Sequence, residues 1–297
     1  MVKVKKSLVI TDLDNTLFDW FEIWYRPFRA MLDELALKSG IPAETLEADF
    51  KEVHQKHGTS EYAFAIEELR SLRIKHPGGD VVEIYKTAID QYRLTRRQVL
   101  QLYPTVKESL EKIRSQGTLI VAYTESLAFY TRYRLKKLGL DFLLDYLYSP
   151  EDNELPDGLT AEQIRLYSAE HYELAHTRQR YTSRGELKPN PKILAEIIDE
   201  VGGKSEDVIY VGDSLMKDVV MAQTACVTDV YARYGQVQHR PEYELLRRVT
   251  HWKPSAVETE KILTEAEVKP SFVLQNTFSE ILNYFEFGGF NGSAPAG

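Results

Sequence analysis

Short apolar runs that alternate with helical patterns constrain the fold of this chain more than any other feature. The runs are too short for helices and are typical of buried strands. They lie at 7–12, 118–124, 146–148, 208–211, 227–231 and 271–274. Amphipathic patterns between them, such as 105–114 and 191–201, predict helices; Thr105 and Glu108 suggest a capping box for the first of these. This alternation predicts an α/β fold with a doubly wound parallel sheet.

A long helical stretch interrupts this alternation early in the chain. From Leu17 to about Tyr103 the sequence is charged, has few β-branched runs and is broken by turn residues. A length of 297 residues suits about two domains. We therefore expect a core of residues 1–17 and 104–290, an inserted α-helical domain of residues 18–103, and a flexible tail of residues 291–297.

Composition excludes several classes of partner and site. Asp plus Glu (45) outnumber Lys plus Arg (37), and a net charge of −8 argues against binding a nucleic acid polymer by bulk charge. No apolar run approaches the roughly 18–20 residues that span a bilayer, so no membrane partner is expected. The single cysteine, Cys226, excludes an internal disulfide, and we expect it to be a buried small hydrophobe. A cytoplasmic location follows as the expectation.

Polar side chains follow the expected strands at the points where the strands end. Ligands of doubly wound sheets bind beyond the carboxyl ends of the strands, so these residues are the candidate site. They are Asp12, Asp14, Thr124, Glu125, Asp213 and Asp218, with Lys188 preceding the helix at 191–201. Converging carboxylates with few His or Cys partners suit a hard cation, and Mg²⁺ is the expected cofactor.

Four motifs in this order resemble those of the haloacid dehalogenase-like (HAD) superfamily of Mg²⁺-dependent phosphohydrolases. They are DLDNT at 12–16, YT at 123–124, KPNP at 188–191 and GDSLMKD at 212–218. The resemblance implies a Rossmann-like core with a helical cap inserted after the first motif, which is where residues 18–103 lie.

The resemblance also implies a role for each catalytic and phosphate-binding residue. Asp12 would attack phosphorus to give an aspartyl phosphate, and Asp14 would act as general acid and then as general base. Thr124 would hold phosphoryl oxygens, with Glu125 contributing its backbone amide. Lys188 would neutralise Asp12 and the transferring group.

The same resemblance implies a metal site. The side chains of Asp12 and Asp213 and the carbonyl of Asp14 would bind Mg²⁺, with Asp218 supporting the ion directly or through water. A carboxylate at position 14 favours phosphate ester chemistry, because the dehalogenases of the superfamily have no oxygen leaving group to protonate.

The predicted function is a Mg²⁺-dependent phosphatase acting on a small phosphorylated metabolite. One alternative is a phosphotransferase or sugar phosphomutase using the same site, and another is a binding protein that keeps the fold without turnover. Residues 150–186 and 235–270 are expected to be insertions, the first forming an extra lid or an oligomer contact. The oligomeric state itself is left open.

Overall fold

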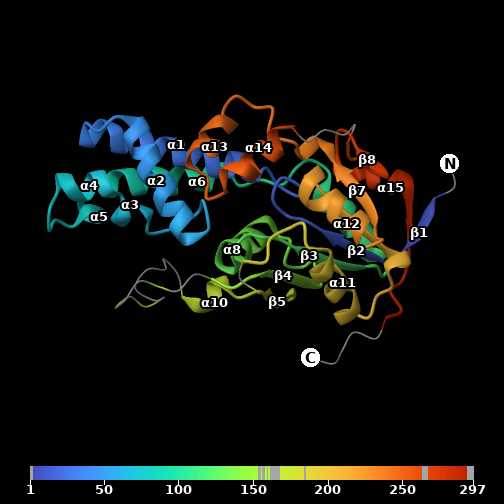
Figure 1. Ribbon diagram of the computed structural model, residues 1–297. Coiled ribbons are helices and arrows are strands. Elements are labelled where there is room, and N and C mark those ends of the chain that lie inside the picture. Colours follow the sequence, from blue (N-terminus) through green and yellow to red (C-terminus); the bar gives the residue numbers. More distant parts are fainter. Residues whose placement is uncertain are drawn as a thin grey trace. The chain divides into compact units, whose positions relative to one another are not determined.

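The computed structural model describes residues 3–152, 155, 158, 160, 168–183, 185–262 and 267–292 (Figure 1). The chain divides into two compact units. The first, here called the sheet unit, comprises residues 1–19, 101–236 and 263–297. The second, the helical unit, comprises residues 20–100 and 237–262.

The sheet unit is built on seven parallel strands in the order β5-β4-β3-β2-β6-β7-β8. The strands are β2 (Leu8–Thr11), β3 (Leu119–Tyr123), β4 (Tyr146–Pro150), β5 (Arg178–Thr182), β6 (Val208–Gly212), β7 (Thr228–Ala232) and β8 (Phe272–Leu274). The helices between and after them are α7 (Val106–Ser115), α8 (Ala128–Leu138), α10 (Ala169–Tyr172), α11 (Pro191–Glu200), α12 (Val220–Thr224) and α15 (Ile281–Tyr284). Leu8 pairs with both Leu119 and Val208, which aligns the carboxyl ends of β3, β2 and β6 at one edge.

Both faces of this sheet are covered. Successive side chains of a strand point to opposite faces, yet Leu8, Val9 and Ile10 are all fully buried. Leu8 and Ile10 pack in one cluster with apolar residues of α11 and α12, such as Leu194 and Met221. Near-continuous apolar strands are the pattern of parallel sheets buried on both sides. The predicted doubly wound α/β fold is confirmed.

Capping interactions at two helices test the local sequence signals. At α11 the Asn190 side chain accepts a hydrogen bond of 3.2 Å from the N–H of Ile193, as an N-cap should. The prediction of a capping box at Thr105 is wrong. Thr105 has φ 68°, and its hydroxyl accepts a bond of 3.1 Å from the N–H of Ser279 instead. A tertiary contact has replaced the local cap.

Parts of the expected insertion at 150–186 extend the sheet. Strand β5 pairs in parallel with β4 and forms one edge, although its sequence RQRYT has no apolar run that would signal a strand. Residues 159 and 161–167 of the helical segment expected at 159–176 lie outside the described residues; within the described part, Ala169–Tyr172 forms α10.

The C-terminal segment is held to the core as far as it is described. Strand β9 (Phe285–Phe287) pairs in parallel with β1 (Val4–Lys6), and the N–H of Phe290 donates to the carbonyl of Gly117 at 2.9 Å. Asn291 and Gly292 are the last described residues, so most of the tail expected at 291–297 lies outside them.

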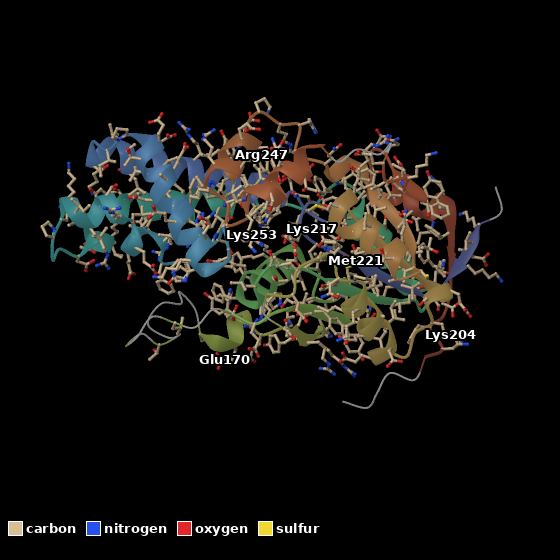
Figure 2. All side chains as sticks on the ribbon, in the orientation of Figure 1. Glu170, Lys204, Lys217, Met221, Arg247 and Lys253 are labelled. Carbon is tan, nitrogen blue, oxygen red and sulfur yellow. The ribbon has the colours of Figure 1, made fainter. Side chains whose placement is uncertain are left out.

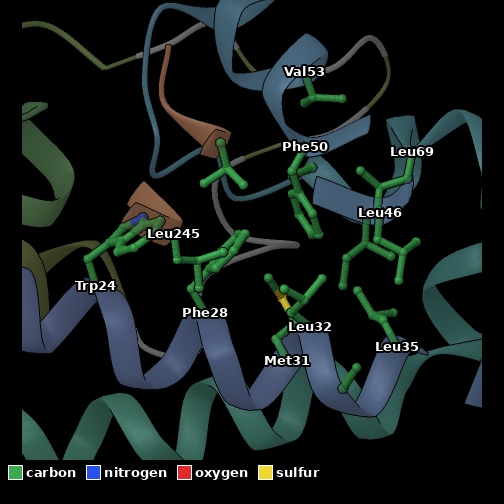
Figure 3. Close-up of a cluster of buried hydrophobic side chains, with 14 of the residues drawn as sticks. Trp24, Phe28, Met31, Leu32, Leu35, Leu46, Phe50, Val53, Leu69 and Leu245 are labelled. Atoms are coloured by element: carbon green, nitrogen blue, oxygen red, sulfur yellow. The ribbon is translucent and has the colours of Figure 1, made fainter. Parts of the chain in front are cut away.

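The helical unit has its own apolar core. Its helices are α1 (Trp20–Ser39), α2 (Ala43–His57), α3 (Ala65–Glu68), α4 (Arg70–Lys75), α5 (Val81–Ile84), α6 (Lys86–Val99), α13 (Tyr243–Val249) and α14 (Pro254–Ile262). Figure 3 shows one face of α1 projecting Trp24, Phe28, Leu32 and Leu35 into this core. The aromatic residues at the start of α1 therefore pack as core, because their helical spacing places them on one face.

The structure corrects two expectations about the chain. Residues 237–262, expected in the core domain, belong to the helical unit, where Tyr243 and Leu245 pack in the same cluster as Phe21. Cys226, expected to be buried, is exposed; it lies in the turn between α12 and β7 and has φ 55°. The chain leaves and re-enters the sheet unit through adjacent segments, since Phe18 pairs antiparallel with Leu102.

Among the described helices, none is both long and apolar enough to cross a membrane.

Candidate active site

Asp12 and Lys188 form a buried ion pair at the carboxyl end of β2. The Nζ atom of Lys188 lies 2.6 Å from Oδ1 of Asp12, and the Thr16 hydroxyl donates to Oδ2 at 3.3 Å. Asp12 is placed by the strand itself, because its N–H donates to the carbonyl of Val211 on β6 at 2.8 Å. The first and third motifs therefore meet in space although 176 residues separate them.

Two further carboxylates lie beside this pair, at the end of β6. One oxygen each of Asp12, Asp213 and Asp218 lies within 4.8 Å of the others, and all three residues are buried; we call them the carboxylate cluster. Asp218 lies on a π-helical turn, η2 (Leu215–Val219), and accepts a bond of 3.0 Å from the N–H of Ser214. Gly212 makes this turn possible, since a Cβ there would lie 2.3 Å from Cγ of Asp218.

Two tyrosines, Tyr123 and Tyr210, complete the surroundings of Lys188. Its Nζ lies 4.9 Å from the ring centre of Tyr123 and 5.4 Å from that of Tyr210, and it donates to Oδ1 of Asp218 at 3.0 Å. The Tyr210 hydroxyl donates to the same oxygen at 3.1 Å. Aromatic faces attract a desolvated cation, so the ammonium is held by charge and by ring contacts together.

Asp14 faces a different set of partners from Asp12. Its Oδ2 accepts bonds from the hydroxyls of Ser126 at 2.6 Å and Thr124 at 3.3 Å. Its Oδ1 lies 3.5 Å from Nη1 of Arg134 on α8. The predicted residue Thr124 is thus linked to Asp14 through its side chain, while its own N–H donates to the carbonyl of Tyr148 at 3.0 Å.

Glu125 joins the loop after β3 to the Lys188 segment and to η2. Its Oε1 accepts a bond of 2.8 Å from the N–H of Lys188, and its Oε2 pairs with the Lys217 ammonium. Figure 2 shows Lys217 in the segment that leads to Met221 on α12. Burial would raise the pKa of Glu125, but the charges of Lys217 and Lys188 outweigh it and hold that pKa below its usual value.

Burial dominates the electrostatics of the carboxylate cluster. It raises the pKa of Asp12 to about 7, although the Lys188 ammonium opposes the shift. Burial, with repulsion from Asp218 and Asp12, places the pKa of Asp213 well above its usual range. Burial alone would lower the pKa of Lys188, yet Asp12 and Asp218 hold it well above the usual value. Three acidic groups lie around one ammonium, so one cation cannot balance the charge when all three are ionised.

The carboxylate cluster fits a divalent cation in its donor chemistry. Carboxylate oxygens from Asp12, Asp213 and Asp218 are hard ligands, and the cluster contains no His or Cys that would favour a softer metal. The repulsion that raises the pKa of Asp213 is what a bound cation would relieve. These residues therefore fit the Mg²⁺ that the sequence motifs imply.

The structure brings the sequence-predicted residues together in two bonded groups at the ends of the strands, and it adds residues that the sequence did not reveal. Asp12, Lys188, Asp213 and Asp218 meet directly, Asp14 is linked to Thr124, and Glu125 is linked to Lys188. The added residues are Thr16, Ser126, Arg134, Tyr210 and Lys217. Thr16, Lys217 and Ser126 lie within or next to motifs and could have been noticed. Arg134 and Tyr210 carry no local signal.

A doubly wound sheet with an acidic cluster at its strand ends fits the class of Rossmann-like hydrolases. Residues 6–225 match the family model described as haloacid dehalogenase-like hydrolase, and residues 187–276 match a second, HAD-hydrolase-like model. The chain therefore belongs to the HAD-like hydrolase family, which confirms the resemblance inferred from the motifs.

The chain is also similar to a curated protein in sequence and to two solved structures in fold. The chain is 26% identical over 235 residues to the glyceraldehyde 3-phosphate phosphatase of Methanopyrus kandleri, covering 77% of this chain and 85% of that protein. The magnesium-bound structure of a Bacillus subtilis protein assigned as the HAD-hydrolase YfnB matches 94% of this chain and 98% of its own, with a TM-score of 0.51 and 12% identity. A Thermotoga maritima protein assigned as a β-phosphoglucomutase matches 93% and 97%, with a TM-score of 0.50 and 15% identity. At such identities the structural likeness is one of fold.

Proposed function

We propose that this chain is a Mg²⁺-dependent phosphatase that hydrolyses a small phosphomonoester through an aspartyl phosphate on Asp12. The observation that carries the proposal is the environment of Asp12: a carboxylate at a strand end, 2.6 Å from the Lys188 ammonium and within the carboxylate cluster. Phosphoryl transfer depends mainly on positioning and on neutralising charge, and this arrangement supplies both.

In the first half of the reaction, a carboxylate oxygen of Asp12 attacks phosphorus. The new Asp12 O–P bond forms as the ester P–O bond breaks, and Asp14 gives its proton to the departing oxygen. Lys188 offsets negative charge beside Asp12 while the phosphoryl group is transferred. The backbone amide of Glu125 and the hydroxyl of Thr124, which would turn from Asp14 to do so, are proposed to hold the phosphoryl oxygens.

In the second half, water attacks phosphorus as the Asp12 O–P bond breaks. Asp14 takes a proton from that water, so phosphate leaves and Asp12 returns to its carboxylate form. Splitting the reaction in this way replaces one difficult step by two easier ones. Since Asp14 must exchange protons in both halves, its orientation matters throughout.

The metal site is proposed on the carboxylate cluster. Asp12, Asp213 and Asp218 would hold Mg²⁺ with the carbonyl of Asp14, and the ion would neutralise phosphoryl charge.

The substrate class is proposed as a small phosphorylated metabolite. The Methanopyrus kandleri relative is a phosphatase of glyceraldehyde 3-phosphate, and its 26% identity supports a phosphate ester of similar size. The helical unit is proposed to act as the cap that selects the substrate.

Release of p-nitrophenol from p-nitrophenyl phosphate tests this function. Wild type with Mg²⁺ should be active, and both chelation and Asp12→Asn should reduce kcat by several orders of magnitude. Asp229→Asn is a matched control, because Asp229 is a buried aspartate of β7 that bonds to Ser271 rather than to the site. Equal activity of wild type and Asp12→Asn would overturn the covalent mechanism.

The same preparation separates the alternative functions. A phosphotransferase or phosphomutase would move ³²P from one sugar phosphate to another and release little free phosphate. A protein that only binds would show no turnover in the wild type with any phosphorylated metabolite tested. The phosphatase proposal expects release of inorganic phosphate to exceed transfer.

A further inference from the structure

Three residues of the sheet unit surround the carboxylate of Asp14. The Ser126 hydroxyl donates to Oδ2 at 2.6 Å, the Thr124 hydroxyl donates to the same oxygen at 3.3 Å, and Nη1 of Arg134 lies 3.5 Å from Oδ1. We call Thr124, Ser126 and Arg134 the Asp14 seat. Both oxygens of the Asp14 carboxylate are therefore contacted by this group of residues.

Arg134 is the unusual member of the Asp14 seat because it is a buried cation. The residue is only 3% exposed, its Nη1 is also 3.5 Å from the Ser126 hydroxyl, and its guanidinium lies 5.8 Å from the ring centre of Tyr130. Burying a charge is costly unless an opposite charge or good hydrogen bonds compensate it, and Asp14 provides that charge.

The start of α8 fixes the geometry of the Asp14 seat. The Thr131 hydroxyl donates to the carbonyl of Ser126 at 3.1 Å, which ties the loop after β3 to the helix that carries Arg134. The N–H of Ser126 donates to the Thr124 hydroxyl at 3.0 Å. The loop, the helix and Asp14 thus form a connected set of contacts.

We propose that Arg134 is a positioning residue that, with Ser126, orients Asp14 for proton transfer to the leaving oxygen. The inference rests on the proposed phosphatase function and adds a residue to it. Arg134 acts through Asp14: its guanidinium is buried against the carboxylate rather than placed to contact substrate. Misplacing a catalytic group by about 1 Å can cost on the order of 100-fold in rate.

This role predicts a dependence on the leaving group. A p-nitrophenolate ion leaves readily without a proton, whereas a phenolate of higher pKa needs the proton that Asp14 supplies as the ester P–O bond breaks. Loss of orientation at Asp14 should therefore slow esters of poor leaving groups selectively. A residue that only stabilises the fold would lower the rates of all the esters by the same factor.

The experiment measures kcat and KM for p-nitrophenyl, phenyl and p-methoxyphenyl phosphate with Mg²⁺. Arg134→Met should lose roughly tenfold more kcat on p-methoxyphenyl phosphate than on p-nitrophenyl phosphate, a fraction of the usual general-acid contribution. Arg134→Lys, which keeps the charge, should recover part of the selective loss. Arg132→Met is the matched control, because Arg132 lies on the same helix and pairs with Asp152, and it should match wild type.

Two further variants make the outcomes decisive. Ser126→Ala removes one hydroxyl from the Asp14 seat and should show the same selectivity, which keeps the test valid if Arg134→Met does not fold. Asp14→Asn should show the steepest leaving-group dependence of all. If it does, and Arg134→Met and Ser126→Ala lose activity equally on all three esters or only through KM, the positioning role is overturned. If Asp14→Asn itself shows no selectivity, the proposed acid role of Asp14 fails instead.

Discussion

The hydroxyl of Tyr210 donates a hydrogen bond of 3.1 Å to Oδ1 of Asp218, the oxygen that also accepts the Lys188 ammonium at 3.0 Å. A strand residue of β6 thereby helps to stabilise a buried carboxylate of the site. Hydrogen bonds to charged groups contribute more to folding stability than hydrogen bonds between neutral groups. A buried carboxylate that loses a donor is therefore destabilising, because its desolvation is no longer fully compensated.

Tyr210→Phe is therefore expected to lower the free energy of unfolding by about 1.5–3 kcal/mol, the range for a hydrogen bond to a charged group. Urea unfolding followed by far-UV circular dichroism measures the change. Tyr123→Phe is the matched control: its ring also faces Lys188, but its buried hydroxyl has no hydrogen-bond partner among the described residues. That variant should be neutral or slightly stabilising, and an equal loss in both variants would contradict the assignment.

Mg²⁺ and an amide at position 213 should each raise the free energy of unfolding, but their effects should not add. Without metal, Asp213→Asn should be more stable than wild type, because it removes one of three mutually repelling buried carboxylates. With Mg²⁺ at 100 times its Kd, wild type should gain about 2.7 kcal/mol, since a ligand of the folded state alone stabilises by mass action. Asp213→Asn should gain little.

Thermal unfolding followed by circular dichroism, with and without Mg²⁺, measures the stability difference between the variant and wild type and the gain that Mg²⁺ gives to each. Asp229→Asn serves again as the control, and its response to Mg²⁺ should equal that of wild type. A wild type indifferent to Mg²⁺ would argue against a metal site on the carboxylate cluster.

Gly235 makes a close approach to the loop after β2 that no larger residue can make. An added Cβ would lie 1.8 Å from the carbonyl oxygen of Asn15 and 3.1 Å from Cβ of Asp213. Asn15 has φ 58° and its N–H donates to the carbonyl of Phe18 at 2.8 Å, in the same loop that carries Asp12 and Asp14. Gly235→Ala should cost at least about 1–3 kcal/mol of stability through overpacking and should lower kcat.

Urea unfolding and the p-nitrophenyl phosphate assay check both effects. Gly288→Ala is the control, since a Cβ there meets nothing within 4 Å, and it should leave stability and kcat close to those of wild type. A fully active, fully stable Gly235→Ala would show that the loop can shift without cost.

The parts of the site that could be predicted from sequence are those fixed by periodicity. A parallel sheet brings the carboxyl ends of its strands to one edge, so the strand pattern alone predicts that Asp12, Thr124 and Asp213 converge. Arg134 and Gly235 could not be predicted, because their importance depends on which backbone or carboxylate lies opposite them. That relation is set by tertiary packing rather than by local pattern.

The same distinction explains the errors in the fold. Strand β5 gives no sequence signal because RQRYT lies at a sheet edge, where apolar residues are not required on both faces. Residues 237–262 are expected in the core domain because they follow its strands in the chain. Their sequence does not indicate that Tyr243 and Leu245 pack in the helical unit. Cys226 is exposed because it lies in the turn between α12 and β7, and its apolar character alone does not place it there.

His54 should make the stability of the helical unit depend on pH. It is buried, and its Nδ1–H donates to the carbonyl of Val249 at 2.7 Å; burial lowers its pKa from 6.5 to about 4. Between these values the unfolded chain binds the extra proton, so stability is full above about pH 6.5 and is lost as pH falls towards 4. From pH 7 to pH 5 the loss from this group should be about 2 kcal/mol.

Tryptophan fluorescence can follow this unit alone, because all 3 tryptophans, Trp20, Trp24 and Trp252, belong to it. Urea unfolding of wild type and His54→Gln at pH 7 and pH 5 gives the comparison. The variant should lose about 2 kcal/mol less between the two pH values, since a glutamine does not titrate. His176→Gln, which alters an exposed histidine of the sheet unit, should leave the wild-type pH dependence unchanged. An undiminished pH dependence in His54→Gln would assign the effect to other groups.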